Sequence, residues 1–162
     1  MDKIIALKKY SIVYLSKYSS SKKNLERILK NKIRRMSPEK SERFVLYNKI
    51  NDIINELESK KLINDDIFTE TKINNYVILG KSKNFIVNNL LNKGLNRDLI
   101  ETKINEYEDE FPNWEIEAAK KFAQKKRLGK YGGNLNFSEK DLAKMARAGF
   151  NYSISLKILE NN

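Results

Sequence analysis

The chain has 162 residues, enough for one domain or a short array of small modules with a buried core. Hydrophobic residues make up 40% and charged residues 33%, which is typical of a folded chain rather than a disordered tail. Cysteine and histidine are both absent, which excludes disulfides, thiolate sites and histidine-dependent catalysis or metal binding. We therefore expect a protein without enzymatic activity and without a cofactor.

The net charge is +11, from 32 basic and 21 acidic residues, and it is unevenly distributed. Residues 1–61 carry +9, residues 62–109 carry −2 and residues 110–162 carry +4. Two basic ends flank an acidic middle, a pattern that a uniform codon bias does not predict. The uncharged run 84–92 is far too short to cross a bilayer, and charge interrupts the first apolar stretch of the chain. We therefore expect a soluble, cytoplasmic protein with no membrane contact.

Nearly the whole chain is predicted to be helical. Six glycines and two prolines are too few for a many-stranded protein, and apolar residues recur at intervals of three and four. Residues 46, 50, 53 and 57 illustrate this spacing on one helix face. The predicted helices, in chain order, cover residues 3–18, 21–32, 42–60, 66–80, 82–94, 98–108, 114–129, 138–149 and 152–160.

Several helix ends are marked by residue type. The segment 37–39, Ser-Pro-Glu, predicts a helix start, because a capping serine precedes a proline and an acid. Ser138 and Asp141 resemble a capping box with aspartate in place of glutamate. Gly94 and Gly149 predict left-handed helix stops.

Three segments, residues 21–32, 82–94 and 138–149, resemble one another. Each is a serine-started helix of two to three turns, closed by a tight turn and an apolar residue. Counted from the last residue of each segment, apolar residues recur seven, four and three positions earlier and one position later. Any amphipathic helix has apolar residues at the first three of these spacings. The evidence for a repeat is therefore the shared turn, the apolar residue that follows it and the similar flanking helices.

The repeat predicts three tandem three-helix modules at residues 1–62, 63–110 and 111–162. A single module of this size has a small core, and stacking lets each module cover the apolar surface of its neighbour. We therefore expect an all-α, elongated and curved array of three modules with a long concave face. We expect the protein to be a monomer.

The chain resembles the RecX family of bacterial recombinase regulators over nearly its whole length. The resemblance is carried by residues 57–69, 76–81 and 90–95, and by the residues around the last glycine. The motif residues are Asp65, Asp66, Phe68, Gly94, Gly149 and Phe150. Two departures are Thr69, where the family usually has alanine, and Lys32, where the first module lacks its glycine.

The resemblance implies a non-enzymatic regulatory protein with three tandem three-helix modules. It implies that the protein binds RecA–DNA filaments, lies in the filament groove and inhibits recombinase activity in DNA repair, recombination and the SOS response. Single- or double-stranded DNA is then an expected partner, contacted directly or through the filament.

Two basic segments are candidates for contact with this partner or with phosphate. In the first, Lys23, Arg27, Lys30 and Arg34 step by four, three and four along one helix face. The second contains four candidates on two neighbouring sides of a helix: Lys120, Lys121, Lys125 and Arg127. A solvated helix face in a lysine-rich protein is the ordinary interpretation of the same pattern.

Other candidate sites are interpreted structurally. Asp65 and Asp66 are adjacent at a helix start and do not converge on one ion, so we predict helix capping rather than a metal site. Trp114, Phe122 and Tyr131 are predicted to be core residues rather than base-stacking residues. No glycine pattern matches a nucleotide-binding loop.

Three alternatives remain open. Ile154 and Ile158 after Gly149 loosely resemble a helix-turn-helix, so direct DNA binding is the first alternative. A small carboxylate-metal enzyme and a plain scaffold are the other two.

Overall fold

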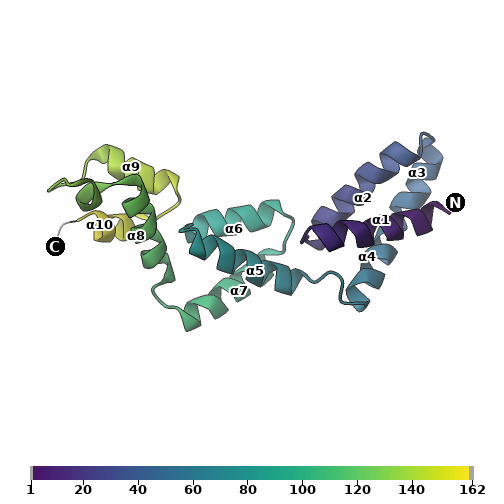
Figure 1. Cartoon of the computed structure of the whole chain (residues 1–162), viewed down its shortest axis with the longest axis horizontal. Helices are drawn as coiled ribbons and strands as arrows, with labels where there is room; N and C mark the ends of the chain where they lie inside the picture. The colour runs from purple at the N-terminus through teal and green to yellow at the C-terminus, as the bar shows by residue number, and fades with distance from the viewer. Residues whose placement is uncertain (1, 161–162) are drawn as a thin grey trace. The chain divides into compact units, whose positions relative to one another are not determined.

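A computed structural model describes residues 2–160, and within them the chain is all-α, which confirms the predicted fold class (Figure 1). No β-strand occurs among the described residues. The helices, in chain order, are α1 (Lys3–Lys17), α2 (Lys22–Met36), α3 (Lys40–Tyr47), α4 (Ile50–Ser59), α5 (Asp65–Ile78), α6 (Lys83–Asn92), α7 (Arg97–Glu110), α8 (Trp114–Lys126), the 3-10 helix η1 (Gly129–Gly132), α9 (Glu139–Arg147) and α10 (Tyr152–Leu159).

The chain divides into two compact units. The first contains the residues up to Phe68 together with Lys93–Leu95, and the second contains Thr69–Asn92 and the residues from Asn96 onward. The order of the helices is consistent with tandem three-helix modules. The module boundaries after residues 62 and 110, and the curved shape, stay predictions.

The core of the first unit gathers apolar side chains from α1 to α4. Leu25, Leu29 and Ile33 of α2 are spaced by four and fully buried. Ser11 of α1 is also buried, and its Oγ donates to the Leu7 carbonyl at 2.8 Å, which satisfies the hydroxyl inside the core. The apolar face predicted over the next helical segment is confirmed by the burial of Leu46, Ile50, Ile53 and Leu57.

The single helix predicted over residues 42–60 is two helices in the structure. α3 ends at Tyr47 and α4 begins at Ile50. Between them the Lys49 amide donates to the Leu46 carbonyl at 3.0 Å, a three-residue step that tightens the backbone. The bend keeps Leu46 and Ile50 inside the same core.

The helix start predicted at residues 37–39 is wrong. α3 begins at Lys40, and Glu39 precedes it without a side-chain cap. Ser37 instead ends α2, where its buried Oγ accepts from Lys3 Nζ at 3.1 Å. The proline that follows Ser37 accounts for the end of α2 at this point, because it disfavours helical backbone at the residue before it.

In the second unit α8, α9 and α10 share one core, which includes three buried alanines of α8. α8 ends at Lys126, before the predicted residue 129, because Arg127 adopts a left-handed φ of 55°. The Leu128 amide then donates to the Ala123 carbonyl at 2.9 Å, and the Leu128 side chain is buried. A left-handed residue at this place is an ordinary helix stop.

The three repeated helices begin directly after the predicted serines, and the apolar residue one position after each repeated segment is buried. The capping box of Ser138 and Asp141 is confirmed. Leu95 and Phe150 follow the two predicted turns and are at most 4% exposed. The turn predicted at Lys32 is wrong, because α2 continues to Met36 and Ile33 is fully buried inside that helix. The end of each repeated segment is therefore part of a core.

None of the three apolar positions before the aligned turn is buried in all three repeats, and the position three residues before it fits worst. Leu29 is buried at the position three residues before the aligned turn, but Leu91 is half-buried and Ala146 is exposed. The better register starts at the serine caps. Four and eight residues after Ser21 and Ser82, α2 buries Leu25 and Leu29, and α6 buries Ile86 and Leu90.

A repeated contact, here called the serine joint, occurs once in each unit. In the first unit Ser21 Oγ accepts from the Asn24 amide at 3.2 Å and donates to the Lys93 carbonyl at 2.8 Å. The backbone amide of Lys22 donates to the Asp65 carboxylate at 2.9 Å. Both contacts use the first turn of α2, whose amides have no partner within the helix.

The serine joint of the second unit uses the same parts. Ser82 Oγ accepts from the Phe85 amide at 3.1 Å and donates to the Ala148 carbonyl at 2.7 Å. The backbone amide of Lys83 donates to the Glu115 carboxylate at 2.7 Å. A hydroxyl, a carbonyl just before a glycine and a carboxylate near the start of another helix therefore recur in both units.

Glycine follows the accepting carbonyl in both serine joints because a side chain does not fit there. Gly94 and Gly149 have φ of +80° and +94°. A Cβ would overlap Lys23 at Gly94 and the hydroxyl of Ser82 at Gly149. Lys32 stands at the corresponding place of the first repeat, inside α2, with Nζ over the Tyr10 ring at 4.8 Å, so it takes part in packing against α1.

Candidate partner-binding surfaces

The basic stripe predicted on α2 is partly neutralised within its own helix. Glu26 pairs with Lys30 at 2.8 Å and with Lys23 at 3.1 Å. The hydrogen bond from Lys30, assisted by that from Lys23, lowers the pKa of the Glu26 carboxyl, so this carboxylate keeps its charge. Arg27 and Arg34 donate instead to uncharged asparagine side chains of α2, at 2.8 and 2.9 Å. They are the members of the stripe best able to attract an anion.

The four candidate cations near the end of α8 do not form one surface. Lys121 and Lys125, one turn apart, line the same hollow, whereas Lys120 is exposed outside it. Arg127 lies beyond the end of the helix and does not continue the row predicted from Lys120. Lys121 and Lys125 are thus the two predicted cations that the structure brings together.

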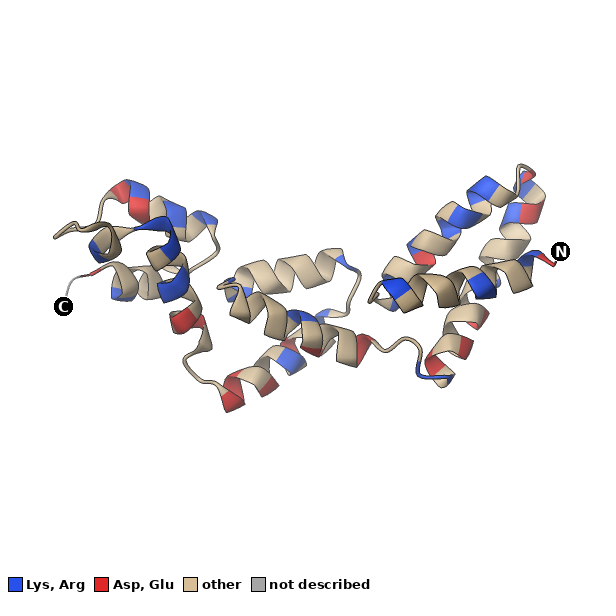
Figure 2. Cartoon of the chain, viewed as in Figure 1, with Lys and Arg blue, Asp and Glu red and all other residues tan. Residues whose placement is uncertain are grey.

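The hollow lined by Lys121 and Lys125 is a groove of about 570 Å³ in the second unit. The α8 segment carries several of the basic residues of this unit (Figure 2). No carboxylate is among the lining residues, so the positive potentials of the lining cations add. We call it the cationic groove, and it is lined by Ile78, Leu79, Gly80, Lys81, Phe85, Lys121, Phe122, Lys125, Lys126, Arg147 and Ala148.

The serine joint of the second unit holds the walls of the cationic groove together. Ala148, which lines the groove, is also the residue whose carbonyl accepts from Ser82. On the opposite wall a Cβ on Gly80 would lie 3.4 Å from the Ala118 carbonyl oxygen, which shows how closely the end of α5 approaches α8. Cations from three separate segments are positioned by these backbone contacts.

The sequence did not single out four important residues of this groove. Lys81 and Arg147 add two cations, and Ile78 and Leu79 add exposed aliphatic surface, with 70% and 67% of their areas accessible. One signal was available, because Ile78 and Leu79 are adjacent apolar residues just before a glycine. Their proximity to α8 and α9 depends on the fold.

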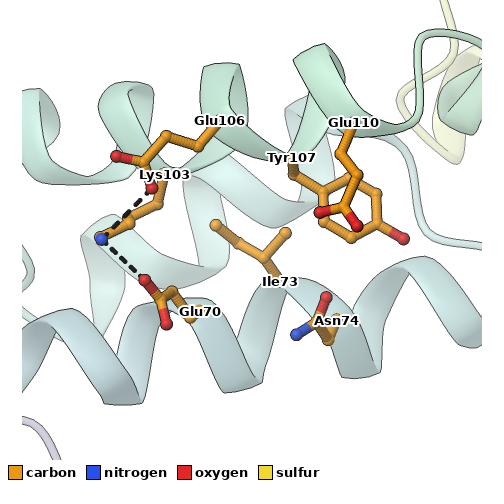
Figure 3. A pocket seen from close by; sticks show the side chains of 7 residues that line it. All are labelled: Glu70, Ile73, Asn74, Lys103, Glu106, Tyr107 and Glu110. Atoms are coloured by element: carbon orange, nitrogen blue, oxygen red, sulfur yellow. Dashed lines mark hydrogen bonds and ion pairs between the residues drawn. The ribbon is translucent and has the colours of Figure 1, made fainter.

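A second hollow, of about 270 Å³, lies between α5 and α7 and is acidic. Lys103 bridges Glu70 at 2.7 Å and Glu106 at 3.3 Å, while Glu110 and Tyr107 lie at the other end (Figure 3). The hydrogen bond that Lys103 donates to Glu70, together with the one that it donates to Glu106, raises the pKa of Lys103. Three carboxylates around one lysine leave this surface negative, so it repels phosphate.

The paired aspartates at the start of α5 have different surroundings in the structure. Among residues 2–160 no group of histidine, cysteine, aspartate or glutamate side chains is arranged to hold a metal ion. Of the capping side chains expected at residues 64–66, the cap is Asn64, whose Oδ1 accepts from the amides of Asp66 and Ile67 at 2.9 and 3.1 Å. Asp65 and Asp66 lie in the first turn of α5, where their negative charge is favoured by the helix dipole, as expected. Asp65 serves the first serine joint.

The three aromatic candidates belong to cores, as predicted. Trp114 is 4% exposed, and Phe122 and Tyr131 pack against the core of α8 to α10. The Phe122 ring lies 5.8 Å from that of Phe150. All three are at least partly buried, as expected for core residues rather than for base-stacking residues.

Helices α9 and α10 follow one another in the chain as the two helices of a helix-turn-helix do, but the surface of α10 differs from that of a recognition helix. α10 packs against both α8 and α9 and buries Ser155, Ile158 and Leu159. Lys157 is the one basic residue within α10. A helix that reads a DNA groove usually carries several polar and basic residues toward the bases and phosphates.

The fold, the recurring joint and the basic surfaces together define an all-α protein of the helical-repeat class. No helix formed by residues 2–160 has the length and apolar character needed to span a bilayer. No protein-family model matches the chain.

Comparison with known proteins confirms the resemblance found in the sequence. The chain is 28% identical over 161 residues to the regulatory protein RecX of Myxococcus xanthus (strain DK1622), covering 96% of this chain and 85% of that protein. It is 32% identical over 115 residues to the regulatory protein RecX of Clostridioides difficile (strain 630), covering 69% of this chain and 52% of that protein.

Two crystal structures share the fold. RecX from Lactobacillus salivarius matches with a TM-score of 0.71 at 24% identity, covering 97% of this chain and 94% of that one. A second structure, of the regulatory protein RecX, matches with a TM-score of 0.71 at 20% identity, covering 97% and 71%. The chain belongs to the RecX family.

Proposed function

We propose that this protein binds RecA–DNA filaments and inhibits recombinase activity in DNA repair and recombination. The observation that carries the proposal is the similarity to a regulatory protein over 96% of the chain. The cationic groove and the basic stripe of α2 supply surfaces for an anionic, repeating partner. Several weak contacts along one filament gain strength through effective concentration rather than through one deep pocket.

The proposed role needs no chemistry from this chain. The helical scaffold offers charge and shape, and any change in ATP turnover is exerted on the partner ATPase. The protein is proposed to act as a cytoplasmic monomer. DNA is contacted through the filament in this proposal, since α10 offers a single cation to a duplex.

The test is RecA-driven strand exchange and filament ATPase, with RecA from the same genome and the protein added at stoichiometric amounts. Both rates are expected to fall. Unchanged rates would remove the proposal. A pull-down with and without RecA, single-stranded DNA and an ATP analogue separates filament binding from binding to free DNA.

Charge reversals rank the two basic surfaces. Arg27→Glu with Arg34→Glu changes the stripe, and Lys121→Glu with Lys125→Glu changes the groove. Lys140→Glu with Lys144→Glu is the matched control, because these lysines are exposed, one turn apart and outside the groove. We expect inhibition to weaken at least tenfold for the groove variant and to stay unchanged for the control.

A further inference from the structure

The cationic groove combines two properties that one class of ligand satisfies. Its rim carries the cations Lys81, Lys121, Lys125, Lys126 and Arg147 with no lining carboxylate. Phosphates and carboxylates both complement such a rim. The choice between them depends on the apolar part of the groove.

The apolar surface left free in the groove is aliphatic. Ile78 and Leu79, at the end of α5, are among the most exposed apolar side chains of the described chain. A sugar–phosphate backbone leaves such side chains in water, whereas an aliphatic or aromatic side chain of a protein removes them from it. A polypeptide is therefore favoured over a nucleic acid as the ligand, because it would bury Ile78 and Leu79 on binding.

The aromatic rings of the groove are already engaged. Lys81 Nζ lies 4.7 Å from the centre of the Phe85 ring, and the Tyr76 ring meets Phe85 edge to face at 5.6 Å. Phe122 packs on Phe150. Proteins that bind single-stranded nucleic acid without sequence preference stack bases on open aromatic faces, whereas both rings of this groove already have partner side chains.

We propose that the cationic groove binds an acidic segment of a protein partner that carries an apolar side chain. The apolar side chain lies on Ile78 and Leu79, and flanking carboxylates pair with Lys121, Lys125 and Arg147. A volume of about 570 Å³ lies within the range of about 300–1,000 Å³ for clefts that hold a small ligand, so the groove holds a short segment. The inference rests on the proposed function, since the protein of the filament is the expected source of the segment.

The test measures fluorescence anisotropy with the full chain and two labelled probes. One probe is a short peptide with two adjacent leucines flanked by glutamates, and the other is a thymidine oligonucleotide of similar length. Ile78→Ser with Leu79→Ser is expected to weaken peptide binding at least tenfold. The matched control is Phe44→Ser with Val45→Ser, an adjacent pair on α3 with 68% and 56% exposure, which is expected to bind like the parent.

Two further readouts make the result decisive. Replacing the leucines of the peptide by serines is expected to weaken binding at least tenfold at unchanged charge. If both peptides bind equally, if neither binds, or if the oligonucleotide binds more tightly and loses affinity only with Lys121→Glu and Lys125→Glu, the inference is overturned.

The same variants in the filament ATPase assay separate the two proposals. Inhibition by the parent that persists unchanged in the Ile78→Ser, Leu79→Ser variant overturns the inference and leaves the proposed function intact. Peptide binding by a protein that does not affect the filament has the opposite meaning: it overturns the proposed function and supports the acidic segment as a ligand.

Discussion

The serine joint of the second unit predicts a large effect of a single methyl group. In Gly149→Ala the new Cβ overlaps the hydroxyl of Ser82 and lies 3.3 Å from Asn84 Cβ, on a backbone with φ of +94°. Left-handed backbone costs a non-glycine residue about 1–2 kcal/mol. Displacing the Ser82 hydroxyl from the Ala148 carbonyl costs about 1 kcal/mol more. The expected loss of unfolding free energy is therefore about 2–3 kcal/mol.

Gly133→Ala is the matched control for backbone strain. Gly133 has φ of +80°, but a Cβ there meets nothing within 4 Å, so only the conformational cost of about 1–2 kcal/mol is expected. Urea unfolding is followed by the fluorescence of Trp114, the one tryptophan of the chain, which lies in the second unit. Equal losses in the two variants would refute the steric argument.

Removal of the overlapped hydroxyl gives an independent check. Ser82→Ala alone loses the cap on the Phe85 amide and the bond to Ala148, at about 1–2 kcal/mol. In the double variant with Gly149→Ala, the new Cβ no longer meets the Ser82 hydroxyl. The hydrogen bond to Ala148 is lost in both single variants but can be lost only once in the double variant. The double variant is therefore expected to be less destabilised than the sum of the two single variants.

The remaining predictions concern two carboxylates. Glu115→Ala is expected to destabilise the second unit by about 1–2 kcal/mol, because the Lys83 amide loses its acceptor. Glu115→Gln keeps an accepting oxygen and removes a charge whose burial raises the pKa of this carboxyl, so its urea midpoint is expected to match the parent; equal losses in both variants would contradict this. Hydrogen bonds from Lys8 and then Lys60 lower the pKa of Glu56 from 4.5 to about 2. Its contribution to the first unit is therefore present above pH 4.5 and is lost as the pH falls towards 2. Urea unfolding followed by circular dichroism across this window is expected to show a smaller pH dependence for Glu56→Gln, and identical curves would rule out this role.

Helices and caps were predictable because their signals are local. The spacing of Leu46, Ile50, Ile53 and Leu57 identified a buried face, and the pair of Ser138 and Asp141 identified a capping box. The break between α3 and α4 was missed, since no glycine or proline marks it and its apolar spacing continues across the bend.

The candidate site was predictable only in part, because it is assembled from distant segments. Lys121 and Lys125 follow from a helical spacing that the sequence displays directly. Lys81 and Arg147 come from other elements and join them through backbone contacts at Gly80 and Ala148. On α2, the spacing of the basic residues predicted a surface for an anionic partner but did not take Glu26 into account. Glu26 pairs with Lys23 and Lys30 and so reduces the positive charge of that face.

The unequal ends of the three repeats bear on how such a chain can change its length. Each serine joint needs a capped helix start on one side and a glycine turn on the other. A duplicated copy of the segment that ends at Gly149 brings both parts with it, so duplication there regenerates a working junction. The segment that contains Lys32 brings only the serine, and a copy of it inserted downstream would place a long side chain where the junction needs a bare backbone. Gene duplication in such a lineage is therefore expected to have copied its later segments rather than its first.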